Sequence, residues 1–212
     1  MGYLARFHAA TWDTPEIEPG GRWGDLPEFF AVMQDFFDEK SSAENWARFM
    51  AAPRGVASSR HFQDRDWLVA SWTKMAAYAR SLPHCVLHGD IHLGNLYIDP
   101  DGTPGFLDTL ASRGPGMLEV AYHISGSLDV ADRPKWEGAL VRHYLDELER
   151  AGAPAPTFDE AMAQYAILLL YGYFIWITTE SHYQAEAVNT VNAMRSTMAM
   201  LDHETARRIA DL

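Results

Sequence analysis

The sequence predicts an α+β fold that is predominantly helical, with one small β element in its middle. Most segments repeat apolar residues at intervals of three and four, which is the period of an amphipathic helix. Three short apolar stretches near the centre are too brief for helices, and two of them flank a run of Asp, Pro and Gly residues that favours a turn. The 212 residues are 48% hydrophobic and 22% charged, which suffices for a single sizeable core and predicts one domain over 1–212.

The first third of the chain is predicted to be helical apart from one loop. Leu4 to His8 has the pattern of the end of a helix that starts upstream of Met1, whereas the Pro- and Gly-rich residues 13–24 are predicted to form a loop. Helices are expected over 26–37, 43–50 and 65–80. The last of these has the strongest apolar stripe, formed by Trp67, Leu68, Ser71, Trp72, Met75 and Tyr78.

The centre of the chain carries the predicted β structure. Residues 85–87 are expected to form a short strand, and residues 96–98 and 105–107 a hairpin closed by the turn Asp99-Pro100-Asp101-Gly102. Helices account for the remainder, and Thr157 with Glu160 forms a capping box that opens the most apolar of them. These helices are expected over 117–128, 135–150, about 157–179, 185–200 and a short final segment.

One stretch of the sequence carries the chemistry, and it reads Val86-Leu87-His88-Gly89-Asp90-Ile91-His92-Leu93-Gly94-Asn95. An Asp followed after four residues by an Asn is the spacing of a kinase catalytic loop. There the Asp accepts the proton of the substrate hydroxyl and the Asn binds Mg²⁺. A second carboxylate, Asp108, follows the apolar run Gly105-Phe106-Leu107, where a kinase has its main Mg²⁺-binding Asp. The alternative is a loop whose polar side chains only cap nearby backbone.

These residues resemble those of a known family. His88-Gly89-Asp90-x-His92-x-x-Asn95, followed by Leu107-Asp108, is similar to the motif of the aminoglycoside phosphotransferase (APH) and choline kinase-like family. The family usually has an aromatic residue after the second Asp, where this chain has Thr109. The resemblance implies the C-terminal lobe of a protein kinase-like fold. It also implies an ATP-dependent phosphotransferase that uses Mg²⁺ and transfers the γ-phosphate of ATP to a small-molecule hydroxyl.

The resemblance also assigns roles to individual residues. Asp90 would be the base or the group that orients the hydroxyl, and Asn95 and Asp108 would be the Mg²⁺ ligands. His88 and His92 are expected to support the loop, and Glu119 to brace its backbone, unless Glu119 is merely a solvated acid in the first turn of a helix. The substrate-binding residues are not assigned. Candidates for the cleft, or for the rim of the core, are Trp176, Glu180, His182 and Tyr183.

Two other functional classes remain open. Gly89-Asp90-Ile91-His92 resembles the Asp-x-His opening of the metallophosphatases, although the later blocks of that family are missing and Asp108 is left unexplained. A non-catalytic remnant or binding module is the other possibility. It is suggested because neither a glycine-rich loop nor a strand lysine precedes the motif, so the N-terminal lobe is expected to be absent. Self-association, or a separate chain that supplies this lobe, is therefore expected.

Composition limits the partners and the location. The net charge of −12 argues against a nucleic-acid surface and is compatible with a cationic substrate, although solubility alone would explain it. The single cysteine, Cys85, excludes an intrachain disulfide and is expected to be buried. The N-terminus lacks the apolar core of a signal peptide. The longest apolar run, 166–177, is too short to span a bilayer, so no membrane contact and a cytoplasmic location are expected.

Overall fold

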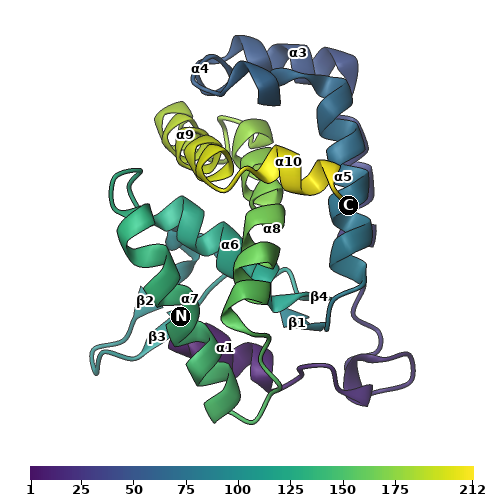
Figure 1. Ribbon diagram of the computed structural model, residues 1–212, viewed down its shortest axis with the longest axis vertical. Helices are drawn as coiled ribbons and strands as arrows, with labels where there is room; N and C mark the ends of the chain where they lie inside the picture. Colours follow the sequence, from purple (N-terminus) through teal and green to yellow (C-terminus); the bar gives the residue numbers. More distant parts are fainter.

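The computed structural model describes all 212 residues and shows a predominantly helical α+β architecture. Two small antiparallel sheets lie beside the N-terminal helix at one end, and α5 and α8 run from there toward the opposite end, where α3 and α4 lie (Figure 1). The helices are α1 (Gly2–Ala9), α2 (Phe29–Lys40), α3 (Ala43–Ala51), α4 (Pro53–Val56), α5 (Arg65–Arg80), α6 (Gly116–Ser127), α7 (Arg133–Arg150), α8 (Phe158–Thr178), α9 (Glu186–Asp202) and α10 (Thr205–Ala210). The strands are β1 (Cys85–Leu87), β2 (Leu96–Ile98), β3 (Pro104–Phe106) and β4 (Ser112–Gly114).

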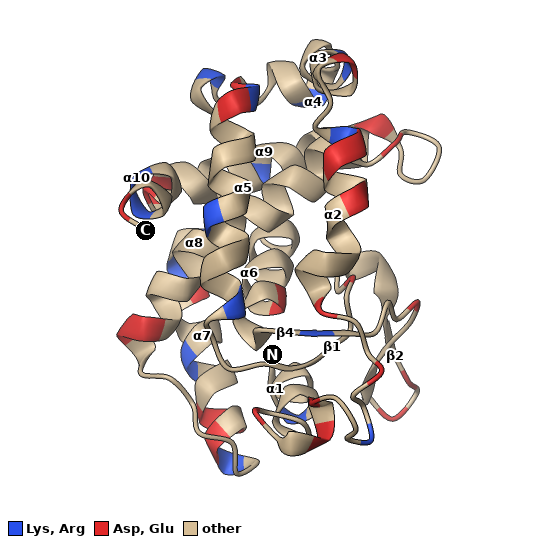
Figure 2. Ribbon diagram, turned by 90° about the vertical axis from the view of Figure 1, so that its right-hand side faces the viewer, with Lys and Arg blue, Asp and Glu red and all other residues tan.

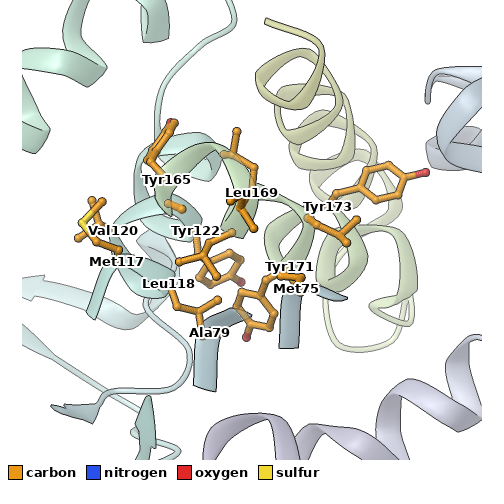
Figure 3. Packing of buried hydrophobic residues seen from close by; sticks show 14 of the residues in the cluster. Met75, Ala79, Met117, Leu118, Val120, Tyr122, Tyr165, Leu169, Tyr171 and Tyr173 are labelled. Carbon is orange, nitrogen blue, oxygen red and sulfur yellow. The ribbon is translucent and has the colours of Figure 1, made fainter. Parts of the chain in front are cut away.

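Helix α8 is the centre of the core. By length and composition it could cross a membrane, but 83% of its most apolar window is buried inside the protein, as predicted for a core helix. It packs closely on α6 and α9, and a single cluster of 43 buried apolar residues surrounds it. Figure 3 shows part of this cluster, in which Tyr122 of α6 lies beside Tyr171 of α8. Their ring centroids are 5.2 Å apart.

Aromatic stacking joins the N-terminal helices to this core. The Trp72 ring of α5 stacks on Phe37 of α2 with centroids 4.4 Å apart, and it contacts Phe174 of α8 at 4.9 Å. Such contacts add about 0.5–1.5 kcal/mol each beyond the burial of apolar area. The apolar stripe predicted for 65–80 therefore fixes α5 against α2 and α8, and the predicted bounds of this helix are confirmed.

The two sheets place the catalytic-loop motif between them. Strand β1 pairs with β4, with Cys85 opposite Gly114, and β2 pairs with β3, with Leu96 opposite Phe106. The predicted hairpin is confirmed, although its second strand begins at Pro104 rather than Gly105. Strand β4 was not predicted because Ser112-Arg113-Gly114 lacks the β-branched and aromatic residues that mark strands.

Some predicted helix bounds were wrong. The helix expected from residue 26 begins at Phe29, because Pro27 and Glu28 are extended and lie along β4, where the Arg113 N–H donates to the Pro27 carbonyl. The Glu28 carboxylate caps this helix by accepting from the N–H groups of Phe30 and Ala31. The expected loop 13–24 contains a short 3-10 turn at Pro15–Ile17. The capping box at Thr157 is confirmed.

A buried ionic cluster ties α7 to the C-terminal helices. Arg133, whose side chain is 1% exposed, bonds Glu137 at 2.5 Å and also bonds Asp202. Glu137 in turn accepts from His203 at 2.9 Å and from the Tyr165 hydroxyl at 3.1 Å. Burial alone would raise the pKa of Glu137. The hydrogen bonds and positive charges of His203 and Arg133 outweigh that effect, so the pKa lies below its usual value.

Removing the Glu137 charge should therefore destabilise the fold strongly. Glu137→Gln leaves a buried guanidinium without its main partner, and we expect the free energy of unfolding to fall by about 3 kcal/mol in urea titrations. Because the folded-state pKa of Glu137 is lowered, its contribution is present above the pKa of the unfolded chain and disappears as the pH falls through the folded value. The stability difference between wild type and variant should thus shrink in acid.

A matched surface variant separates this effect from a general loss of charge. Lys135 forms an ion pair with Asp132 at the start of the same helix, with both side chains more than half exposed. Lys135→Gln should change stability by less than about 0.5 kcal/mol. Equal effects of the two variants, or an effect of Glu137→Gln that grows in acid, would contradict this interpretation of the cluster.

Candidate active site

Strand β1 leads directly into a tight turn at Gly89 that only glycine can form. Its φ is 93°, and a Cβ at this position would lie 2.3 Å from the Leu110 carbonyl oxygen. The turn holds the motif against the chain that follows β3. The Leu110 N–H donates to the His88 carbonyl at 2.7 Å, and the Leu107 N–H to the Asn95 carbonyl at 2.8 Å. Residues far apart in the motif, such as Asp90 and Asp108, are thereby placed on neighbouring segments.

The Asp90 carboxylate is held by three side chains yet remains accessible. The Tyr122 hydroxyl donates to Oδ1 at 3.2 Å, and Asn95 Nδ2 donates to Oδ2 at 3.2 Å. His92 Nε2 lies 3.5 Å from Oδ2, and the Asp90 side chain is 32% exposed. Burial, followed by the charge of Asp90, raises the pKa of Tyr122 well above its usual value, so the phenol stays protonated and donates.

The Asn95 amide has a defined orientation. Its Nδ2 donates to both the Asp90 carbonyl, at 2.8 Å, and the Asp90 carboxylate. Since both of these groups only accept, the NH₂ end must face them and Oδ1 must face the other way. The residue is buried, with 7% of its surface exposed. Asn95 is therefore positioned to offer an oxygen, not a nitrogen, to a ligand next to Asp90.

Asp108 comes directly after Leu107, whose N–H donates to the Asn95 carbonyl, and Asp108 is exposed. Its φ of 53° is unusual for a residue with a side chain, although Asp tolerates it better than most. Mg²⁺ is commonly bound by one or two carboxylates together with substrate phosphates, so an Asp and an amide oxygen suit it. No group of three or more His, Cys, Asp or Glu residues is arranged to hold a metal.

Glu119, at the start of α6, accepts hydrogen bonds from the backbone of the catalytic loop. Its side chain is 4% exposed, and it accepts from the His88 N–H at 3.1 Å and from the Gly89 N–H at 2.6 Å. The alternative of a solvated first-turn acid is therefore wrong. His8 of α1 donates to the same carboxylate at 2.8 Å and contacts the Tyr144 hydroxyl at 2.9 Å. His8 was missed, because a lone His on an apolar helix gives no signal of a partner more than a hundred residues away.

The two histidines of the motif both contact the loop. His88 is buried, its Nδ1 accepts from the Asp90 N–H at 3.3 Å, and its ring lies 5.6 Å from that of Phe106. His92 Nδ1 accepts from the Gly94 N–H at 2.9 Å, and its ring packs on the edge of Trp176. A third histidine, His123, bonds the Ile91 carbonyl at 2.9 Å. Burial lowers its pKa, so it is neutral and donates this bond at neutral pH.

A cavity of about 630 Å³ opens beside Asp90, between α2, α6 and α8. Trp176, Glu180 and Tyr183 line it, whereas His182 does not. Glu180 is already paired, because Lys40 lies 3.4 Å and Arg48 2.7 Å from its carboxylate. Figure 2 shows Lys and Arg dispersed among the acidic residues of the whole molecule, with no continuous basic stripe.

Arg54 of α4 fixes the rim of this cavity. Its side chain is 3% exposed and bonds the Thr179 carbonyl, the Ser181 hydroxyl at 2.9 Å and Glu186. This hydrogen-bonded pairing outweighs partial burial and lowers the pKa of Glu186 to about 2, so the pair stays charged at any physiological pH. The segment that carries Glu180 and Tyr183 is therefore anchored at both ends. Arg54 lies in a short helix that the sequence did not predict.

The class of protein to which this chain belongs is shown by comparison with known families. Residues 2–155 match the family model of APH, the phosphotransferase enzyme family, and the chain belongs to this family. The resemblance stated from the motif is thereby confirmed, as is a phosphotransferase-type function in general terms. No curated protein and no solved structure gives a significant match.

Proposed function

We propose that residues 1–212 form the C-terminal lobe of a kinase-like fold and belong to an ATP-dependent small-molecule kinase. The observation that carries the proposal is the Asp90 carboxylate, which is oriented by Tyr122 and Asn95 at the edge of a cavity large enough for a small alcohol. The Asp90 side chain is 32% exposed and lines this cavity, so an acceptor hydroxyl could reach it.

The arrangement supports direct transfer of the phosphoryl group. The acceptor hydroxyl in the cavity would donate its proton to Asp90 as its oxygen forms a bond to the γ-phosphorus of ATP. The bond between the γ-phosphorus and the bridging oxygen breaks, and ADP leaves with that oxygen. Tyr122 and Asn95 keep the carboxylate in one orientation, which is the positioning on which such reactions depend.

Asn95 and Asp108 are the residues that would hold Mg²⁺, which neutralises charge on the phosphates when it is bound. Apolar residues next to Asp108 in the sequence are exposed, with Leu107 at 48% and Leu110 at 67%, and Ile98 in the adjoining hairpin is 75% exposed. We infer that this surface is covered in the active enzyme, by a nucleotide-clamping lobe or by a second copy of the chain. A single buried cysteine without a disulfide partner, together with the proposed use of ATP, supports a cytoplasmic location.

The direct test is the transfer of phosphate from ATP to a panel of small alcohols, followed by ³¹P NMR. We expect slow formation of a phosphomonoester that requires both Mg²⁺ and the alcohol. Release of phosphate from phosphomonoesters without ATP, dependent on zinc or manganese, would support the hydrolase instead. Absence of both reactions at high protein concentration would favour a binding module.

ATP binding by these 212 residues alone should be weak. The residues that would contact the phosphates lie on one wall of the site only, and no glycine-rich turn over the phosphates is found among the described elements. We expect no binding detectable by calorimetry at ordinary concentrations, together with self-association in light scattering through the exposed apolar surface. Tight, Mg²⁺-dependent binding of ATP by a monomer would contradict this prediction.

A further inference from the structure

A second space of about 260 Å³, the α2 groove, lies next to the cavity beside Asp90, and Leu110 lines both. None of the residues that line the α2 groove is charged, and its one polar side chain belongs to Ser112, which is buried. The other side chains of its lining are apolar and come from Pro27, Phe29, Val32, Met33, Leu110 and Ala111. Because a charged group would lose its hydration there without gaining a partner, the groove suits a hydrocarbon.

The α2 groove and the cavity follow one face of the same helix. Phe29 and Met33 of α2 line the groove, whereas Phe36 and Lys40 line the cavity. These four residues are spaced by four, three and four positions, which places them in a row on one side of a helix. At 1.5 Å per residue the row is about 16 Å long. A ligand of that length could therefore extend from the cavity into the groove along α2.

The walls of the α2 groove are accessible to a ligand. Val32 is 54% exposed and Leu110 is 67% exposed. Pro27 and Ala111 are exposed as well, and Met33 is partly buried. Contact with a ligand would remove this apolar surface from water, which is favourable roughly in proportion to the area covered. Apolar residues that are exposed together and beside a candidate catalytic group mark a binding groove more than single exposed residues do.

The cavity provides the polar end of the combined space. Of the three carboxylates that line it, Glu39 lies 2.9 Å from Lys40, and Glu180 is paired with both Lys40 and Arg48. Asp90 is left as the one carboxylate without a Lys or Arg partner. An acceptor would thus meet one available acidic group, which the proposed mechanism uses for the hydroxyl proton. A cationic group on the acceptor, although compatible with the net charge of −12, would find no second carboxylate free to bind it.

We propose that the acceptor is a neutral alcohol with an apolar tail, which places its hydroxyl at Asp90 and its tail in the α2 groove. This inference rests on the proposed kinase function and names the substrate class of the same site. The continuity of the two spaces through Leu110 and along α2 carries it. A protein partner fits less well, because a stable interface covers about 800 Å² on each side, far more than a groove of this size offers by itself.

The test labels the methionine methyl groups with ¹³C and follows Met33 by NMR in the full chain, with no ATP present. Met33→Leu identifies the resonance by its loss. The probes are 1-butanol, 1-hexanol and 1-octanol, together with the cationic 6-amino-1-hexanol. We expect a saturable shift of the Met33 resonance, with a Kd that falls about three- to fourfold for each methylene that enters the groove. The amino alcohol should bind about tenfold more weakly than 1-hexanol, because its ammonium group would have to leave water.

Nuclear Overhauser effects (NOEs) between the alcohol and the protein then show which end lies where. The terminal methyl group of 1-octanol should give NOEs to the Met33 methyl group. The CH₂ group next to the hydroxyl should give NOEs to the ring of His92, which lines the cavity with Nε2 3.5 Å from the Asp90 carboxylate. The reverse pattern, with the tail at His92, would overturn the proposed orientation.

A pair of variants shows that binding depends on the groove. Val32→Asp introduces a carboxylate into the apolar lining at an exposed helical position, where the fold tolerates it, and should weaken binding of 1-octanol at least tenfold. Val191→Asp in α9 is the matched control, since Val191 is also an exposed helical valine and lines neither the groove nor the cavity. It should leave the affinity unchanged.

The outcomes separate this inference from the proposed function. Equal affinities across the three alcohols, equal effects of the two Asp variants, or no Met33 shift overturn the apolar site. A Met33 shift that follows protein concentration and not alcohol concentration would place a second copy of the chain in the groove, and would also overturn it. Phosphorylation of glycerol without any Met33 response to alcohols would do the same while leaving the kinase function intact. The expected shifts and NOEs without any phosphoryl transfer would overturn only the kinase function.

Discussion

Asp90→Asn is expected to lower the rate of phosphoryl transfer about a thousandfold while leaving the fold intact. General base catalysis contributes typically 10²- to 10⁴-fold, and an amide cannot accept the hydroxyl proton. The Asn side chain has nearly the same shape, so Tyr122 can still donate to its oxygen. Its NH₂ group, however, would oppose the NH₂ group of Asn95. We expect the free energy of unfolding to change by less than about 1 kcal/mol.

The effect should appear in kcat and not in nucleotide affinity, because the proposed mechanism places Asp90 at the acceptor hydroxyl rather than at ATP. The measurement is kcat and KM for both substrates in whichever assembly shows activity. Asp99→Asn in the exposed turn of the hairpin is the control and should be neutral. A well-folded Asp90→Asn protein with near-normal turnover would remove Asp90 from the mechanism, and it would leave the metal ligands untested.

The sequence predicted the local features of this protein well, because they depend on neighbouring residues. The apolar stripe from Trp67 to Tyr78 predicted the bounds of α5. The turn that begins at Asp99 predicted the hairpin, and the capping box at Thr157 predicted the start of α8. The spacing of the motif predicted that Asp90 and Asn95 lie together, and their side chains are in contact. In each case the signal lay within a few residues of the structure it predicted.

The missed features depend on residues distant in the chain. Strand β4 exists because it pairs with β1, and α2 starts late because Pro27 joins β4. His8 reaches the loop only through the packing of α1. Arg54 anchors a segment more than a hundred residues later in the chain. No pattern in a single sequence records such partners, so the motif could be identified while most of its surroundings could not.

Glu119→Gln should disrupt both the stability of the domain and the position of the loop. The carboxylate accepts from His88, Gly89 and His8, using both oxygens, in a buried site. Gln offers one oxygen and one NH₂ group, so at least one of these three donors loses its acceptor and faces another donor. We expect the free energy of unfolding to fall by about 3 kcal/mol, since unsatisfied buried groups each cost about 1–3 kcal/mol.

The same substitution should lower kcat, because Glu119 sets the backbone from which Asp90 projects. A displacement of about 1 Å at a reacting group can cost about a hundredfold, so we expect kcat to fall by that factor with little change in KM. Asp146→Asn in α7 is the control, since Asp146 is exposed and its carboxylate forms no ion pair. If Glu119→Gln is as stable and as active as that control, the loop does not depend on Glu119.

His8 gives an independent measure of this coupling. Burial raises the pKa of Tyr144 well above its usual value, so the phenol donates to His8 Nδ1 and the opposite N–H of His8 donates to Glu119. In a double-mutant cycle, His8→Ala and Glu119→Gln should be less than additive by about 1–2 kcal/mol, because each removes the same hydrogen bond. Additive effects on stability would show that α1 and the catalytic loop are held independently, and that Glu119 braces the loop without help from His8.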